Sequence, residues 1–319
     1  MKRLAVRLAP WALALGLAAC ATHSPTPPST TVPAAPTTAT LPPQMPPPAP
    51  KPLPKPRVAL ALGGGAAKGF AHVGVIKVLE ENGIYPDIVT GTSAGSVVGS
   101  LYASGYSGLA LQKKATQLDE TDLTDLVISS RGFIKGERLA GFINREVGNR
   151  PIEKLKKPFG AVATELDTGR KVVFRSGNTG QAVRASASIP NVFQPVLIGR
   201  RQYVDGGLVS PVPVSAAREM GADFVIAVDI SARPRAGAAT GFLTILDQSL
   251  NIMNVSALVQ ELRQADVTIR PQVQNIGSAA FEARSQAIRE GEKAARQAVP
   301  IIQKLLQARA QSMAQAAAK

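Results

Sequence analysis

From residue 57 onward, short apolar runs that end at glycine alternate with longer segments of helical apolar spacing. Residues 57–62 are apolar after the first position and break at Gly63-Gly64-Gly65, which predicts a strand followed by a glycine turn. Over residues 70–82 the apolar side chains recur at helical spacing, and Gly83 stands where a glycine commonly ends a helix. The pattern therefore predicts a strand, a glycine loop and a helix.

The same alternation continues directly afterwards. A second apolar run, residues 87–90, breaks at Gly91, and helical spacing resumes over residues 94–104. Strand, loop, helix, strand, tight turn and helix in this order form a βαβα unit, which favours a parallel sheet covered by helices. Further strands are predicted at residues 159–165, 171–175, 224–230 and 266–270, and a long C-terminal helix at about residues 282–310.

The first nineteen residues have the pattern of an export signal. The basic residues Lys2, Arg3 and Arg7 precede an apolar run from Leu8 to Ala18. That run is about half of the roughly twenty residues that a membrane-spanning helix needs. We therefore predict that residues 1–19 are a signal peptide that takes no part in the fold.

The signal ends at Leu17-Ala18-Ala19-Cys20, which resembles the lipobox of bacterial lipoproteins. In such proteins the cysteine is acylated and becomes the mature N-terminus, and two or three acyl chains suffice for stable anchoring. Cys20 is the only cysteine, so it has no partner for an intramolecular disulfide. Ala21, where aspartate would otherwise signal retention, implies an outer-membrane anchor with the protein facing the periplasm. The alternative is an ordinary signal cleaved beside a chance cysteine.

Proline dominates the segment that follows. Residues 21–56 contain fourteen of the chain's 25 prolines, mixed with Thr, Ser and Ala. This composition cannot bury a core and favours a semi-extended polyproline II tether, although a featureless spacer is equally compatible. We predict a lipidated cysteine plus tether at residues 20–56, one α/β domain at 57–310 and a frayed, Ala-rich tail at 311–319.

The chain is basic, because 36 Lys and Arg against 22 Asp and Glu give a net charge of +14. A positive surface suits anionic lipid headgroups and would equally suit nucleic acid. Export argues against nucleic acid, so we expect a membrane lipid as the partner. The sequence contains neither a Cys/His cluster nor a calcium-binding loop, so no metal or other cofactor is implied.

Gly91-Thr92-Ser93-Ala94-Gly95 matches the G-x-S-x-G pattern of a nucleophile elbow. The predicted strand before it and helix after it are the required context, since the serine sits on a strained strand-to-helix turn. Gly91 and Gly95 let the backbone pass closely, and the positive end of the helix favours the negative charge that develops during attack. Ser93 is therefore the candidate nucleophile, although five matching residues in a chain with 28 glycines can be accidental.

A serine nucleophile usually needs a histidine base, and the chain contains two histidines. His23 lies in the proline-rich tether. His72 lies on the helix after the glycine loop, where we expect it to pack or cap rather than to relay protons. A Ser/His/Asp triad is therefore poorly supported.

Two further pieces continue the order of the glycine loop and the elbow: Ala187-Ser188-Ile189-Pro190 with Phe193 and Pro195, and Val204-Asp205-Gly206-Gly207-Leu208 with Pro211 and Pro213. Together with the glycine loop 63–69, the helix start at residues 71–80 and the elbow 91–96, these pieces resemble the patatin-like phospholipase family, whose hydrolases use a Ser/Asp dyad without histidine. Each piece alone is weak, but their order and spacing over about residues 57–270 are specific. The resemblance implies a three-layer α/β fold in which helices cover both faces of a mostly parallel sheet.

By this resemblance Asp205, in a turn with Gly206 and Gly207, accepts the proton of Ser93. Aspartate is ordinarily a weak base for a serine hydroxyl, because the pKa of its carboxyl is near 3.9. A direct hydrogen bond in a dry pocket, with proton transfer concerted with attack, reduces this mismatch. The alternative is that Asp205 is simply the turn residue before two glycines.

The resemblance also places the oxyanion hole in the glycine loop, because successive N–H groups in a glycine turn form an anion-binding nest. Here Lys68 replaces the arginine of the plant-type pattern and an extra residue precedes it, which leaves open which two amides point at the oxyanion. Lys68 either holds the loop or lies on the surface. Matching on the basic residue assigns the donors to Gly64, Gly65 and Ala66 and the support of the loop to Gly63, Lys68 and Gly69.

Two phosphate-binding interpretations of this loop fail. A P-loop needs Ser or Thr after its Gly-Lys pair, whereas Gly69 follows the lysine here and Phe70 comes next. A dinucleotide fingerprint needs its last glycine where Lys68 stands.

The sequence thus predicts a serine acyl hydrolase that cleaves fatty-acyl esters of phospholipids or lysophospholipids. Two alternatives stay open: an esterase or thioesterase for non-lipid acyl groups, and a non-catalytic envelope scaffold that kept the fold. Residues 237–258 form an apolar stretch that either lines an acyl pocket or is an ordinary buried helix face.

Overall fold

The computed structural model describes residues 53–117, 136–232, 241, 245, 248–249 and 252–318. Residues 51–319 form one structural unit. Within the described ranges, no helix is both long enough and apolar enough to cross a membrane. The predictions for the signal peptide, for Cys20 and for the tether as far as residue 52 lie outside the described residues.

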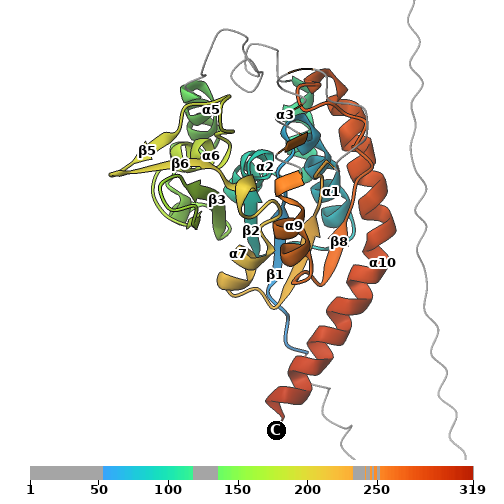
Figure 1. Cartoon of the computed structure of the whole chain (residues 1–319). Helices are drawn as coiled ribbons and strands as arrows, with labels where there is room; N and C mark the ends of the chain where they lie inside the picture. The colour runs from blue at the N-terminus through green and yellow to red at the C-terminus, as the bar shows by residue number, and fades with distance from the viewer. Residues whose placement is uncertain are drawn as a thin grey trace, which may run out of the picture. The chain divides into compact units, whose positions relative to one another are not determined.

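Among the described residues the strands form one eight-stranded sheet, and five neighbouring strands of it are parallel (Figure 1). They are, in spatial order, β3 (Phe159–Glu165), β2 (Ile88–Thr92), β1 (Val58–Leu62), β7 (Phe224–Val228) and β8 (Val267–Ile269). Every residue of the four strands from β3 to β7 is buried, which explains their nearly continuous apolar sequences. The carboxyl ends of β1 and β2 meet at one edge, so the glycine loop and Ser93, which follow them, lie together there.

Antiparallel strands extend the sheet beyond β3. Both β4 (Lys171–Phe174) and β6 (Arg201–Asp205) pair with β3, and β5 (Val196–Ile198) pairs with β6. The sequence pattern did not predict β5 and β6, which are short and partly exposed. The antiparallel course of β6 brings Asp205 opposite Ala163, in the interior of β3.

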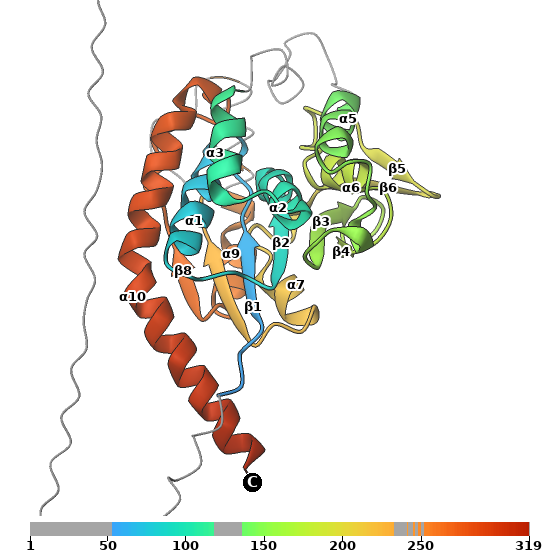
Figure 2. The same ribbon diagram turned by 180° about the vertical axis from the view of Figure 1, so that it is seen from behind.

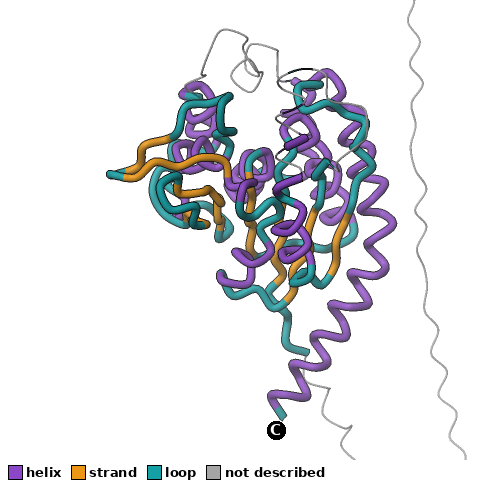
Figure 3. The backbone as a smooth tube through the Cα atoms, in the orientation of Figure 1, coloured by secondary structure: helices purple, strands orange, loops and turns teal. Residues whose placement is uncertain are grey.

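Helices cover both faces of the sheet, which confirms the predicted three-layer α/β fold (Figure 2). Alternate β1 side chains, beginning with Val58, enter the larger core, which also contains side chains of α1 (Phe70–Glu81), α2 (Ala94–Ser104) and α10 (Arg284–Ala317). Ala59 and Ala61 face the other side, where α7 (Val214–Glu219) and α9 (Val255–Leu262) pack. In Figure 3 most of the orange strands lie between purple helices, and β5 and β6 extend outward at the left.

Smaller helices complete the fold. Beside β3 and β6, α5 packs on α6, and α3 packs on α1. The short 3-10 helices lie at chain reversals, two of them in the glycine loop and directly after β6. The bounds of these elements are Gly108–Gln117 for α3, Glu137–Glu146 for α5 and Thr179–Ser186 for α6, with 3-10 helices at Ala66–Gly69, Ile152–Lys154, Gly206–Leu208 and Phe281–Ala283.

The prediction of a frayed tail at residues 311–319 is wrong, because α10 continues to Ala317. After Pro300 this segment consists mainly of Ala, Gln, Leu, Met and Lys, which are strong helix formers, and it contains no glycine or further proline to end the helix. The helix therefore runs well past residue 310, the expected end of the domain.

Candidate active site

Ser93 lies on a strained turn between β2 and α2. Its backbone has φ 53° and ψ −122°, a positive φ that is rare for a residue with a side chain. A Cβ atom at Gly95 would lie 2.0 Å from the Leu62 carbonyl oxygen, and one at Gly91 would lie 2.4 Å from the Gly95 carbonyl oxygen. Only glycine fits at both positions, so the turn has the geometry of a nucleophile elbow.

A buried serine holds this turn from outside. The Ser93 backbone N–H donates to the Ser186 hydroxyl oxygen at 3.0 Å, and the Ser186 hydroxyl donates to the Val162 carbonyl of β3 at 2.6 Å. Ser186 is fully buried at the end of α6. Sequence reasoning missed this residue, because its partner lies 93 positions away and no local pattern marks it.

Asp205 ends β6 and is fixed on three sides. Its N–H donates to the Ser188 carbonyl at 2.8 Å, and its carbonyl accepts the Thr164 hydroxyl at 2.8 Å. Its carboxylate Oδ1 accepts the Gly207 N–H at 2.7 Å. The neighbouring Gly206 is required because a Cβ atom there would lie 2.1 Å from the Val162 carbonyl oxygen.

The structure brings the side chains of Asp205 and Ser93 together, both less than one tenth exposed. Burial raises the pKa of Asp205 to about 6, while the nearby Ser93 hydroxyl and the Gly207 N–H act to lower that pKa. Asp205 Oδ2 makes no hydrogen bond of standard geometry within the described residues. Hydrogen bonds in a substrate-free active site are often loose, so Oδ2 is the oxygen available to the serine.

The glycine loop lies against the serine, since a Cβ atom at Gly64 would be 3.3 Å from that of Ser93. The Gly64 N–H donates to the Pro211 carbonyl at 2.9 Å, and the Gly63 N–H donates to the Val228 carbonyl at 3.1 Å. The expectation that Gly64 is an oxyanion donor is therefore corrected, because the Pro211 carbonyl already accepts the hydrogen bond of the Gly64 N–H. The N–H groups of Gly65 and Ala66 have no acceptor among the described residues, so both are available.

The other loop residues support its conformation. Lys68 is 4% exposed, so its side chain is inside the protein and not on the surface. A Cβ atom at Gly69 would lie 2.6 Å from the Ala94 Cβ, which shows how closely the loop packs on the start of α2. Ala66 has φ 48°, a positive value that is uncommon for a residue with a side chain, where the chain passes from the glycines into the 3-10 helix.

His72 packs beneath the loop, as expected, and does not contact the reactive groups. It is fully buried, and its Nε2 lies 2.8 Å from the Gly63 carbonyl oxygen. Burial lowers the pKa of His72 to about 4, so the ring is neutral at pH 7 and Nε2 carries the proton that it donates to Gly63.

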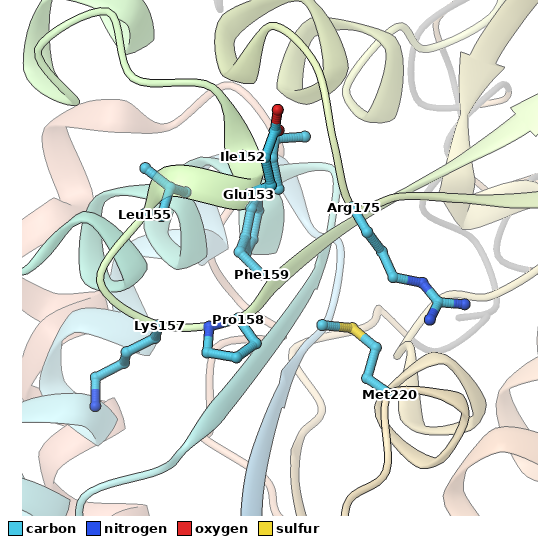
Figure 4. A pocket seen from close by; sticks show the side chains of 8 residues that line it. All are labelled: Ile152, Glu153, Leu155, Lys157, Pro158, Phe159, Arg175 and Met220. Atoms are coloured by element: carbon cyan, nitrogen blue, oxygen red, sulfur yellow. The ribbon is translucent and has the colours of Figure 1, made fainter.

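A cavity of about 300 Å³ lies beside the amino-terminal end of β3 (Figure 4). It is lined by residues between Ile152 and Phe159 together with Arg175 and Met220. Since Phe159 begins β3 and pairs at its amino-terminal end with β2, this cavity contains none of the predicted site residues. Within the described part of the chain, no group of three His, Cys, Asp or Glu residues is arranged to hold a metal ion.

The apolar stretch 237–258 is only partly described. Ile245 and Ile252 are more than half exposed, so at these two positions neither a buried helix face nor a closed pocket wall is present. Leu258 is buried, on the inner side of α9. Met253 and Val255 are exposed as well. Phe242, Leu243, Leu246 and Leu250 lie outside the described residues.

The protein is thus a three-layer α/β protein with a serine elbow at the end of a central parallel strand. A family model described as patatin-like phospholipase matches residues 60–218, which include the glycine loop, Ser93 and Asp205. The chain therefore belongs to the patatin-like phospholipase family, through the domain that contains these residues. The family resemblance expected from the sequence is confirmed.

Relatives of very different length share this region. An uncharacterised NTE family protein of Mycobacterium tuberculosis is 39% identical over 179 residues, which are 55% of this chain and 49% of that protein. Human patatin-like phospholipase domain-containing protein 6 is 32% identical over 191 residues, 57% of this chain and 14% of that protein. Lysophospholipase NTE1 of Coccidioides immitis is 35% identical over 181 residues, 55% of this chain and 12% of that protein. The chain thus spans about half of the mycobacterial relative and less of the other two.

A solved structure has the same fold. VipD from Legionella pneumophila superposes with a TM-score of 0.54 at 16% sequence identity, over 76% of this chain and 66% of that one. At this identity the likeness supports the three-layer architecture alone.

Proposed function

We propose that the protein is a lipid ester hydrolase in which Ser93 is the nucleophile and Asp205 the general base. The observation that carries this proposal is the buried Asp205 carboxyl beside a serine on a strained elbow. A base with a pKa of about 6 is still ionised at pH 7, yet it is closer to the ideal for proton transfer than an exposed aspartate.

The proposed reaction has two half-reactions. Asp205 Oδ2 accepts the hydroxyl proton while Ser93 Oγ attacks the ester carbonyl carbon. The resulting oxyanion accepts hydrogen bonds from the N–H groups of Gly65 and Ala66. The C–O bond to the alcohol then breaks, and Asp205 returns the proton to that alcohol. Water attacks the acyl-serine, gives a proton to Asp205, and the fatty acid leaves as Ser93 Oγ takes the proton back.

The substrates we propose are fatty-acyl esters of phospholipids or lysophospholipids. The family description and the lysophospholipase name of the fungal relative support this class. The described site contains acyl-transfer groups only. The preferred lipid head group and acyl chain length are therefore to be measured with a panel of lipids. Hydrolysis of short water-soluble esters with no release of fatty acid from micelles or vesicles would favour an esterase for non-lipid acyl groups instead.

The test of the chemistry is labelling of the full chain with a fluorophosphonate, which reacts with activated serines. We expect wild type to label, Ser93→Ala to stay unlabelled, and Asp205→Asn to label about 100-fold more slowly or less. Ser100→Ala is the matched control, because Ser100 is a buried serine on α2 that donates only within its own helix. A folded wild-type protein that does not label would leave the non-catalytic scaffold as the better interpretation.

We also propose that Cys20 carries the lipid anchor and holds the protein at the outer membrane, facing the periplasm. The sequence Leu17-Ala18-Ala19-Cys20 and the proline-rich residues after it support this arrangement. Metabolic labelling with radioactive palmitate should mark wild type and not Cys20→Ser, and membrane fractionation should find only the variant released. Equal labelling of both would contradict the anchor at this residue.

A further inference from the structure

Helix α9 contributes a buried carboxylate, Glu261, that lies outside the residues matched by the family model. Its side chain is 6% exposed and forms no ion pair with any described residue. A buried carboxylate without a cation is costly unless its oxygens accept hydrogen bonds. The position of these bonds therefore shows what the residue holds.

The three groups that donate hydrogen bonds to Glu261 belong to two residues of one segment, residues 210–215. Oε1 accepts the Ser210 hydroxyl at 2.5 Å and the Ser215 hydroxyl at 2.7 Å, and Oε2 accepts the Ser215 backbone N–H at 2.7 Å. Lys171 Nζ donates to the same Ser215 hydroxyl at 2.7 Å, so this cation is linked to Glu261 through that hydroxyl. The carboxylate thus fixes the segment at both of its ends.

The other side of this segment holds the proposed reactive groups. The Ser210 carbonyl accepts the hydroxyl of Thr92, the residue before Ser93, at 2.8 Å. The Pro211 carbonyl accepts the N–H of Gly64, which precedes the two available amides, at 2.9 Å. Segment 210–215 therefore lies between Glu261 and the backbone that carries both the serine and the oxyanion donors.

We infer that Glu261 is a positioning residue, which acts through the carbonyls of Ser210 and Pro211 to set the distance between the Ser93 elbow and the glycine loop. The inference rests on the proposed ester hydrolysis. A carboxylate suits the task because its two oxygens accept three hydrogen bonds at once, whereas a glutamine offers only one oxygen. Loss of these bonds leaves the Ser210 hydroxyl and the Ser215 N–H without acceptors, so the segment moves to find others.

The expected effect is on the rate of the chemical step and not on the amount of folded protein. A displacement of about 1 Å at a reacting group can cost on the order of 100-fold in rate. We expect Glu261→Ala to lower the first-order rate constant of fluorophosphonate labelling about 10- to 100-fold. At the end of the reaction all of the protein should still be labelled. Glu261→Gln should lose less, because its single oxygen can still accept the Ser215 N–H.

The experiment measures labelling of the full chain as a function of probe concentration, time and pH, with thermal unfolding of each sample. Glu292→Gln is the matched control, because Glu292 is a largely buried carboxylate on α10 that pairs with Lys77 and contacts none of the site residues. Ser210→Ala removes one of the three hydrogen bonds and remains informative if Glu261→Ala does not fold. The pH midpoint should stay that of Asp205 in every variant, since Glu261 does not touch that carboxyl.

The outcomes separate the inference from the proposed function. If wild type does not label, the proposed function fails. If wild type labels and the folded Glu261→Ala, Glu261→Gln and Ser210→Ala variants label at the wild-type rate constant, the function stands and the inference is overturned. A fall only in the labelled fraction, in step with a lower unfolding temperature, would show a purely structural role and would also overturn it.

Discussion

Asp205, the proposed base, meets two opposing requirements at a single carboxyl. The proposed role requires the charged form, but burial favours the neutral form and raises the pKa of Asp205 to about 6. Among the described residues, one hydrogen bond of standard geometry, from the Gly207 N–H to Oδ1, stabilises the charged form, and the nearby Ser93 hydroxyl adds to it. The protein thus retains a carboxylate at neutral pH in an environment that stabilises the charged form poorly. Such a carboxylate takes up a proton readily.

The pH dependence of labelling follows from this carboxyl. We expect the rate constant for fluorophosphonate labelling of wild type to rise with pH through a midpoint of about 6 and then to level off, because only ionised Asp205 accepts the serine proton. Stopped labelling reactions between pH 4.5 and 8.5 measure this profile. The low residual rate of Asp205→Asn should lack the midpoint, and a midpoint that survives in the variant would assign the titration to another group.

The same burial predicts a gain in stability when the charge is removed. The pKa of Asp205 rises from 3.8 to about 6 on folding, so the folded state is favoured below pH 3.8 and loses that advantage as pH rises through 6. The full difference amounts to roughly 3 kcal/mol. Asp205→Asn should therefore unfold at higher urea concentration than wild type at pH 8, and the two proteins should converge near pH 4.

The contribution of His72 to stability changes with pH in the direction opposite to that of Asp205. It is the same in wild type and in Asp205→Asn, so it cancels when the two proteins are compared. Its pKa falls from 6.5 to about 4 on folding, and its contribution to stability is present above pH 6.5 and lost as pH falls through 4. A difference between wild type and Asp205→Asn that is constant across pH would contradict the raised pKa of Asp205.

At the scale of elements, α1 and α10 approach so closely that glycine is needed where they cross. A Cβ atom at Gly74 of α1 would lie 2.1 Å from the Ile288 carbonyl oxygen, and one at Gly291 of α10 would lie 2.0 Å from the Ala71 carbonyl oxygen. Both obstacles are backbone atoms, so no side-chain rotation relieves them. The long C-terminal helix is therefore fixed against the helix that carries His72.

A methyl group at this crossing should force the helices apart. We expect Gly291→Ala to reduce the free energy of unfolding by about 1–3 kcal/mol or more, as overpacking does. Gly141→Ala is the control, because Gly141 lies within α5 and an added Cβ would meet only the end of the Arg145 side chain, at 3.5 Å. That variant should be as stable as wild type or more stable by up to about 1 kcal/mol, since alanine favours helix. Thermal unfolding of both variants decides, and a stable Gly291→Ala would disprove the close crossing.

The sequence predicted the parallel strands and missed β5 and β6, for a physical reason. Strands β1, β2 and β3 are buried on both faces, so their apolar runs stand out, and helix α2 was predicted with its observed bounds of 94 and 104. Strand β6 has exposed arginine and glutamine at its start and was not recognised, although Asp205 at its end was. The contacts of Ser186 and Glu261 join distant segments, so no local pattern could indicate them.

Only part of the long helix α10 packs against the core of the described unit. Its last fully buried side chain is Ile302, and Leu306 packs partly against the core, whereas the later residues are exposed or half-buried. The end of the helix projects beyond the sheet at the lower side of Figure 1. The helix beyond Leu306 therefore adds little to the core.

Truncation measures this division directly. A chain that stops after residue 308 should label at the wild-type rate and unfold within a few degrees of wild type, because it keeps every fully buried residue of α10. A chain that stops after residue 290 should not fold, because it lacks Ala295, Val299 and Ile302 of the larger core. Loss of labelling in the longer truncation would show that the projecting end has a role in the site.

The order of the segments along the chain determines when the site first exists during synthesis. Ser93 is made early, Asp205 reaches it only when β6 has paired with β3, and segment 210–215 is fixed only when Glu261 has emerged. Such long-range contacts form late, because the chain between them must first be closed into a loop. A growing polypeptide that ends before α9 therefore carries Ser93, the proposed nucleophile, without its finished surroundings. The order of the segments thus delays completion of the proposed site until the domain itself is nearly complete.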